Sequence, residues 1–146
     1  MLKTLGGARG FWLLFVLAVV ADQIIKAIIL GGFRAEGSCL SIVLTFNTGV
    51  AFSMLSGLGE WLKYLQIALI VGVGVYFLRS DLISRFGAPI GLLLGSGASN
   101  VLDRFLHGGV VDYIFWHCGF EFAIFNLADV LINLSVAVIL LLHFKR

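Results

Sequence analysis

The sequence predicts an all-α membrane protein with four transmembrane helices and a small β-sheet outside the membrane. Of its 146 residues, 60% are hydrophobic and only 12% are charged, whereas about a quarter of the residues of a soluble domain are charged. So few charged side chains cannot cover a water-soluble surface, and the chain must therefore contact lipid. No linker, internal repeat or low-complexity run divides it, so we expect residues 1–146 to form one domain.

Four stretches approach the roughly 20 apolar residues that a helix needs to cross a bilayer. They run approximately over residues 11–30, 61–78, 87–102 and 125–144, with outer segments at 31–60 and 103–124. The first stretch also has the basic start of a cleaved signal peptide, with Lys3 and Arg9 before it. However, its apolar run continues past Asp22 and is too long for such a peptide. We therefore expect it to remain as a span.

The distribution of charge predicts the orientation of the spans. The termini and the middle loop hold most of the basic residues: Lys3, Arg9, Arg79, Arg85, Lys145 and Arg146. These segments, with Asp81, carry a net charge of +5, and the rest of the chain carries −3. Because Lys and Arg collect on the cytoplasmic side, we expect both termini to lie inside and nearly every carboxylate to lie outside.

The outer segments contain strand patterns. Leu40–Phe46 alternates apolar with other residues at a period of two. Val110–Trp116 and Phe120–Ile124 are rich in β-branched and aromatic residues, with a turn expected at 117–119. We expect a small sheet at the interface, because lipid tolerates no open sheet edge.

Two cysteines, Cys39 and Cys118, flank the predicted strands. A disulfide between them is permitted on the oxidising outer side, although two separate, partly buried thiols are the expectation we favour. The three histidines, His107, His117 and His143, are scattered and form no HExxH motif. We therefore expect no metal and no other cofactor.

Several polar residues fall within or next to the apolar stretches. Asp22 and Lys26 share a helix face at i and i+4, where a structural ion pair is favoured over a proton path or a clamp on a substrate. Asn47 and Gly49 favour a turn, although an Asn amide can also hold a substrate main chain.

A second polar group closes the third stretch, where Asn100 and Asp103 share a face and Arg104 is adjacent. Because a buried Asp–Arg pair is usually architectural, we expect these residues to support a site and not to carry its chemistry.

Asp112 and Asp129 are the candidate catalytic residues. Asp112 lies in an apolar strand, and Asp129 lies near the outer start of the last span; residues 105–144 contain no Lys or Arg. Two carboxyl groups brought together in an apolar place share a proton, as in aspartic proteases. The alternative is two separate interfacial carboxylates, since nothing in the spacing requires them to meet.

Five blocks, in this order and spacing, resemble the signature of the lipoprotein signal peptidase (signal peptidase II) family. They are Asp22–Lys26, Phe46–Phe52, Asn100–Arg104, Val110–Asp112 and Phe125–Asp129. The resemblance implies four transmembrane helices carrying an extracytoplasmic β-cradle, with no metal. It implies a membrane aspartic endopeptidase that cleaves diacylglyceryl-modified prolipoproteins before the lipid-modified cysteine, at the outer face of the bacterial inner (cytoplasmic) membrane. It also implies inhibition by the cyclic peptide globomycin.

By the same resemblance, Asp112 and Asp129 would be the catalytic dyad. The residues that would line, brace or support it are Asp22, Lys26, Asn47, Gly49, Asn100, Asp103, Arg104, Asn126 and Ala128. The chain departs from the family pattern at Ser99, where Gly is usual, and at Val50, where Ala is usual. Ser99 would alter a helix contact, and Val50 would narrow the substrate groove.

Other functions fit the sequence less well. A small four-helix transporter would use Asp22 to bind a cation or proton, but it needs polar groups at mid-depth, and here the carboxylates gather on one side. A non-enzymatic protein that only binds lipoprotein precursors is the third possibility. The net charge of +2 does not indicate nucleic acid. The expected partners are prolipoprotein signal peptides and membrane lipids, and we expect a monomer.

Overall fold

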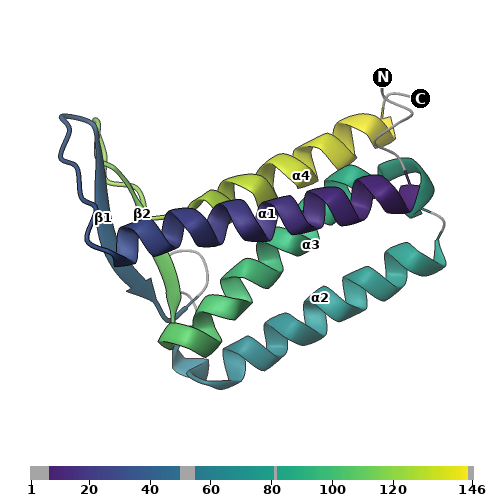
Figure 1. Cartoon of the computed structure of the whole chain (residues 1–146), viewed down its shortest axis with the longest axis horizontal. Helices are drawn as coiled ribbons and strands as arrows, with labels where there is room; N and C mark the ends of the chain where they lie inside the picture. The colour runs from purple at the N-terminus through teal and green to yellow at the C-terminus, as the bar shows by residue number, and fades with distance from the viewer. Residues whose placement is uncertain (1–6, 50–54, 81, 145–146) are drawn as a thin grey trace.

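The computed structural model describes residues 7–49, 55–80 and 82–144. Four α-helices are present in these ranges: α1 (Gly7–Leu30), α2 (Trp61–Arg79), α3 (Leu82–His107) and α4 (Leu127–Phe144). The same ranges contain two strands, β1 (Leu40–Asn47) and β2 (Val110–Trp116), and a short 3₁₀ helix, η3 (Ser56–Leu58). The two strands project at one end of the helices, and the start of α1 and the end of α4 lie together at the other end (Figure 1).

Among the residues that the structure describes, three helices are long and apolar enough to cross a membrane: α1, α2 and α4, with mean hydropathy values of 2.4, 1.6 and 2.2. The predicted membrane class and three of the predicted spans therefore agree with the structure. The third predicted span, residues 87–102, lies within the longer helix α3, which packs against all three other helices. Because its neighbours cover it, α3 buries glycines and polar residues as well as the apolar core residues Phe86, Ile90 and Leu94, whereas a helix that faces lipid would carry mostly large apolar residues.

Helix α1 packs directly against the backbone of α3 through a row of glycines one turn apart: Gly87, Gly91 and Gly95. A Cβ atom on Gly95 would lie 2.5 Å from the carbonyl oxygen of Phe15, and one on Gly91 would overlap the carbonyl oxygen of Phe11. Larger side chains are excluded on this face. Close backbone approach of this kind is the usual way in which membrane helices pack tightly.

The sheet consists of β1 and β2, paired antiparallel with a register shift between Ile42 and Thr45. Both strands match their predictions, but the strand predicted at Phe120–Ile124 is wrong. That segment contacts β2 through Phe122 N–H to Trp116 O and through Phe125 to Ile114. These two contacts differ by one residue in register, and the second is an isolated bridge, so they do not form a continuous ladder.

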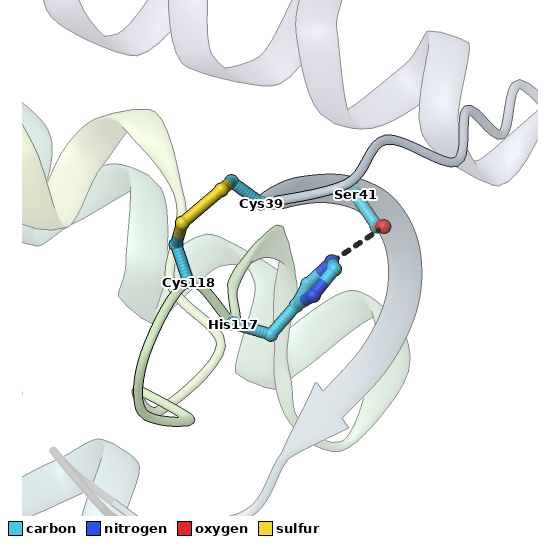
Figure 2. The surroundings of a disulfide bond; sticks show 4 residues. All are labelled: Cys39, Ser41, His117 and Cys118. Carbon is cyan, nitrogen blue, oxygen red and sulfur yellow. Dashed lines mark hydrogen bonds between the residues drawn. A yellow bond between two sulfur atoms is a disulfide. The ribbon is translucent and has the colours of Figure 1, made fainter.

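Cys39 and Cys118 form a disulfide, so the expectation of two separate thiols is wrong (Figure 2). The bond joins the residue before β1 to the segment after β2, where Ser41 and His117 also share a 2.9 Å side-chain hydrogen bond. The main chain adds a bond of 2.9 Å from His117 N–H to Cys39 O. The end of the sheet where β1 begins and β2 ends is thus held by both covalent and hydrogen bonds.

Candidate active site

A cavity of about 440 Å³ lies where α2, α3 and α4 meet the strands, and it contains both candidate catalytic carboxyl groups. The residues that line it are Asn47, Gly49, Gln66, Asn100, Arg104, Val110, Asp112, Phe122, Ala123, Ile124, Phe125, Asp129, Val130, Ile132 and Asn133. Six of the residues singled out from the sequence are among them. The remaining five, Asp22, Lys26, Asp103, Asn126 and Ala128, lie behind this surface, each at most 1% exposed.

Asp112 lies on β2 and is only 2% exposed. Each of its carboxyl oxygens accepts one amide hydrogen bond: Oδ2 from Asn47 Nδ2 at 3.0 Å and Oδ1 from Asn126 Nδ2 at 2.7 Å. Burial raises the pKa of Asp112 to about 6, and the charge of Asp129 adds to this rise, while the two amide hydrogen bonds oppose it. A proton is therefore held on this carboxyl group far more readily than on an ordinary aspartate.

Asp129 is held by the first turn of α4. The side chain of Asn126 accepts a hydrogen bond from Asp129 N–H at 2.9 Å, and Asp129 Oδ2 accepts one from Asn126 N–H at 3.1 Å. This reciprocal pair is a capping box, which fixes the start of a helix and the side chain three residues later. The other oxygen, Oδ1, accepts from Asn100 Nδ2 at 2.9 Å. Asn126 thus contacts both carboxyl groups and links the two.

The first two N–H groups of α4 have no partner within the helix, and other parts of the chain supply partners for them. Leu127 N–H donates to the hydroxyl oxygen of Tyr113, and Ala128 N–H donates to Asp22 Oδ1, each at 3.0 Å. Burial raises the pKa of Tyr113 to about 12, so its phenol stays neutral. Because a carboxylate is favourable at a helix N-terminus, Asp22 stabilises the turn that presents Asp129.

Lys26 lies at the centre of the buried polar group. Its Nζ is 2.6 Å from Asp22 Oδ2 and 2.6 Å from Asp103 Oδ2. It also donates to Asn100 Oδ1 at 2.8 Å. An ammonium group can only donate, so it turns the oxygen of Asn100 toward itself and the Nδ2 of Asn100 toward Asp129. The predicted pair of Asp22 and Lys26 is present, and its effect reaches the cavity through Asn100.

Asp103 and Arg104 do not act as the Asp–Arg pair expected from the sequence. Asp103 pairs with Lys26 and accepts a hydrogen bond from Val111 N–H at 3.1 Å, which fixes β2 one residue before Asp112. The guanidinium of Arg104 instead donates to the carbonyl oxygens of Asn47 and Gly49. The two neighbours point to different partners because successive residues of a helix lie about 100° apart.

Ser99 takes part in the same network. Its hydroxyl donates to Asp22 Oδ2 at 2.6 Å and accepts from Gln23 Nε2 at 2.9 Å. Gln23 also donates to Asp103 Oδ1 at 2.8 Å. The hydroxymethyl group therefore binds polar partners in the α1–α3 contact. Val50, the other departure, lies outside the described residues.

Gln66 is a cavity residue that the sequence analysis did not single out. It projects from α2, and its buried Oε1 atom has no hydrogen-bond partner among the described residues. An isolated amide within an apolar span is itself a signal, because polar groups at membrane depth are costly and usually functional. Within the described ranges, no group of three or more His, Cys, Asp or Glu side chains is arranged to hold a metal ion.

Comparison with known proteins identifies the family. The sequence profile described as Signal peptidase (SPase) II matches residues 14–145. The chain belongs to the signal peptidase II family. Its sequence is 55% identical to a lipoprotein signal peptidase of Wolinella succinogenes over 129 residues, which cover 87% of this chain and 88% of the relative. It is 51% identical to a lipoprotein signal peptidase of Campylobacter jejuni over 142 residues, covering 97% and 91%.

Solved structures show the same fold. A bacterial membrane enzyme determined by the in meso method at 2.3 Å resolution is 30% identical, with a TM-score of 0.81 over 94% of this chain and 88% of that one. Another, at 1.9 Å resolution, is 29% identical, with a TM-score of 0.79 over 94% of each chain. Together with its apolar helices, the family membership makes this chain a membrane peptidase.

Proposed function

We propose that this protein is a membrane aspartic endopeptidase that removes the signal peptide from prolipoproteins by cleaving before the lipid-modified cysteine. The observation that carries the proposal is that Asp112 and Asp129 line one cavity, while Asn126 donates to both carboxyl groups, through its side-chain amide to Asp112 and through its main-chain N–H to Asp129. Membership of a peptidase family whose relatives are named lipoprotein signal peptidases supports the substrate class.

The chemistry follows from a carboxyl pair that carries one proton. The ionised carboxyl group takes a proton from water, and the resulting hydroxide oxygen bonds to the scissile carbonyl carbon. The protonated carboxyl group donates a hydrogen bond to the carbonyl oxygen as negative charge develops there. The C–N bond then breaks, and the proton taken from water goes to the leaving nitrogen of the cysteine. The products are a signal peptide with a free carboxyl group and a lipid-modified cysteine with a free amino group.

The supporting residues keep the pair in this state. The amides of Asn47, Asn100 and Asn126 supply fixed donors to the carboxyl oxygens, and Lys26 orients one of those amides. The raised pKa of Asp112, to about 6, makes a shared proton accessible near neutral pH.

The arrangement of the helices supports a lateral path for the substrate. We place α3 as the fourth span, both termini in the cytoplasm and the cavity at the outer face of the inner membrane, in agreement with the distribution of Lys and Arg. The signal helix of the substrate would lie in the bilayer beside α2 and α4, with the acyl chains on its cysteine in the lipid. A single chain contains the complete site, so we propose a monomer.

A small transporter remains the alternative. In that case the buried polar residues would serve as an ion site near the middle of the membrane. Here they gather where the helices meet the sheet, and the family membership also disfavours transport.

The decisive test replaces each carboxyl group of the pair by an amide. We expect Asp112→Asn and Asp129→Asn each to lower cleavage of a lipid-modified prolipoprotein by about a thousandfold or more, because either change removes a group that moves a proton. Purified protein in detergent or lipid would be assayed for release of the signal peptide.

Glu60→Gln is the matched control, because it makes the same chemical change on a side chain that is 74% exposed and outside the cavity lining. It should cleave at the wild-type rate. Wild-type cleavage by either aspartate variant would refute the dyad, and a wild-type protein that binds but never cleaves would indicate a non-enzymatic function.

A further inference from the structure

Gln66 is an isolated polar residue on an otherwise apolar surface. Apart from Gln66 and Tyr76, residues 65–78 of α2 are aliphatic, glycine or phenylalanine. A primary amide in such a helix has a high desolvation cost unless it finds hydrogen-bond partners. Its side chain lines the cavity that holds Asp112 and Asp129.

Two residues that line this cavity each have a buried atom without a partner within the described part of the chain, and the two atoms have opposite polarity. One is the acceptor Oε1 of Gln66, and the other is the donor Nε of Arg104. An unpaired buried polar group is costly, so each of them favours a ligand that supplies what it lacks. A peptide main chain offers both an N–H donor and a C=O acceptor.

The position of Gln66 along α2 determines which part of a bound peptide it can contact. Gln66 is five residues into α2, so it lies about 7.5 Å along the helix from the end near the sheet. Asp129 is the third residue of α4, which starts at that same end. Gln66 is therefore deeper within its helix than Asp129 is within α4, and it is followed by the apolar residues 67–75, along which a signal helix would lie.

A peptide that is cut at Asp112 and Asp129 must leave its helical conformation before the scissile bond. Its main-chain N–H and C=O groups then lose their helical partners at a depth where water is scarce, and each unpaired group has a large desolvation penalty there. An amide of the protein that is fixed at that depth can replace a lost hydrogen bond, whatever the side chains of the substrate are.

We propose that the Oε1 atom of Gln66 accepts a hydrogen bond from a main-chain N–H group of the substrate segment that precedes the scissile bond. Gln66 is then a positioning residue that binds the extended end of the signal peptide. The assignment rests on the proposed function, since it presupposes a peptide substrate that enters from the membrane.

The first test is Gln66→Met, which keeps the length of the side chain and removes its hydrogen bonds. We expect KM for a lipid-modified peptide to rise about three- to tenfold, the range for one neutral hydrogen bond, with kcat nearly unchanged. Val71→Ala is the matched control on the same helix, because Val71 is 56% exposed, outside the cavity lining and about 140° round the helix from Gln66. It should leave both constants at their wild-type values.

The second test removes the donor from the substrate. In a set of peptides, the amide N–H of each of the last few residues before the scissile bond is replaced in turn by an ester oxygen. At one position the ester should weaken binding to the wild-type protein about three- to tenfold and have little further effect on Gln66→Met, as a double-mutant cycle requires.

The proposal is overturned if every ester weakens binding equally in the two proteins. The cycle is also run as binding in an Asp112→Asn background, where no cleavage occurs. If the wild-type protein cleaves the peptide but no coupling is found in this background, only the assignment of Gln66 is rejected. If the wild-type protein does not cleave the peptide, the proposed function is rejected.

Discussion

At the residue scale, the site depends on Lys26, whose side chain is buried. Lys26 is 1% exposed and Asp22 and Asp103 are each 0% exposed, so three ionised side chains have left water together. Such a group is tolerable only when every charge has close partners, because the desolvation cost of each ion is several kcal/mol. Here Ser99, Gln23 and main-chain N–H groups supply the remaining hydrogen bonds.

Replacing Lys26 by Met should therefore destabilise the protein strongly. We expect a loss of about 3–5 kcal/mol in the free energy of unfolding, because two buried carboxylates are left without a cation. Denaturant unfolding in detergent micelles measures it. Lys63→Met is the control, since Lys63 pairs with a mostly exposed Glu60 and such pairs contribute about 0–1 kcal/mol. Equal losses for the two variants would contradict the structural importance of Lys26.

At the element scale, the close approach of α1 and α3 aligns the two halves of the polar group. Asp22 and Lys26 come from α1, while Ser99, Asn100 and Asp103 come from α3. The contacts of 2.6–2.8 Å between the two helices require their backbones to lie close together. The glycines of α3 allow that approach, so apolar packing at one end of the helices positions polar side chains at the other.

Gly91→Ala should push the two helices apart. The added methyl group would overlap the main chain at Phe11, which cannot move as a side chain can. We expect a loss of stability of about 1–3 kcal/mol, typical of overpacking, together with reduced cleavage. Gly72→Ala is the matched control, because a Cβ there meets nothing within 4 Å. Thermal unfolding of both variants measures the difference, and a Gly91→Ala protein as stable as wild type would contradict the close contact.

At the scale of the whole molecule, the sheet and the helices meet at one end (Figure 1). Both supply residues that line the cavity. β2 supplies Asp112 and is fixed at its start by Asp103, whereas its far end is joined to β1 by the disulfide between Cys39 and Cys118. The sheet is thus held at both ends, which keeps Asp112 in place relative to the helices.

Removing the disulfide should loosen the far end of the sheet and leave the helices in place. In the variant with both Cys39 and Cys118 changed to Ser, we expect faster amide exchange in β1 and β2. The loss of stability should not exceed about 4.5 kcal/mol, the chain-entropy limit for a loop of this length; the cysteines are 79 residues apart. A reductant should produce the same faster exchange in the wild-type protein and should have no effect on this variant. Unchanged exchange in the strands would show that hydrogen bonds alone hold the sheet.

Local patterns in the sequence determined the membrane class, helices α1, α2 and α4 to within a few residues, and both strands of the sheet. The span predicted at 87–102 covers only part of α3, which continues over Leu82–His107 and includes Arg85, Asp103 and Arg104. Its neighbours supply partners for Asp103 and Arg104, and a hydropathy pattern does not contain that information.

The tertiary structure alone decided which polar groups meet. It paired Asp103 with Lys26, joined Cys39 to Cys118, brought Asp112 and Asp129 to one cavity and placed Gln66 on the same surface. It also replaced the strand expected at Phe120–Ile124 with a segment that lines the cavity. The physical reason is that periodicity reports how each residue faces its own helix or strand. The choice of partner depends instead on contacts between segments that are far apart in the chain.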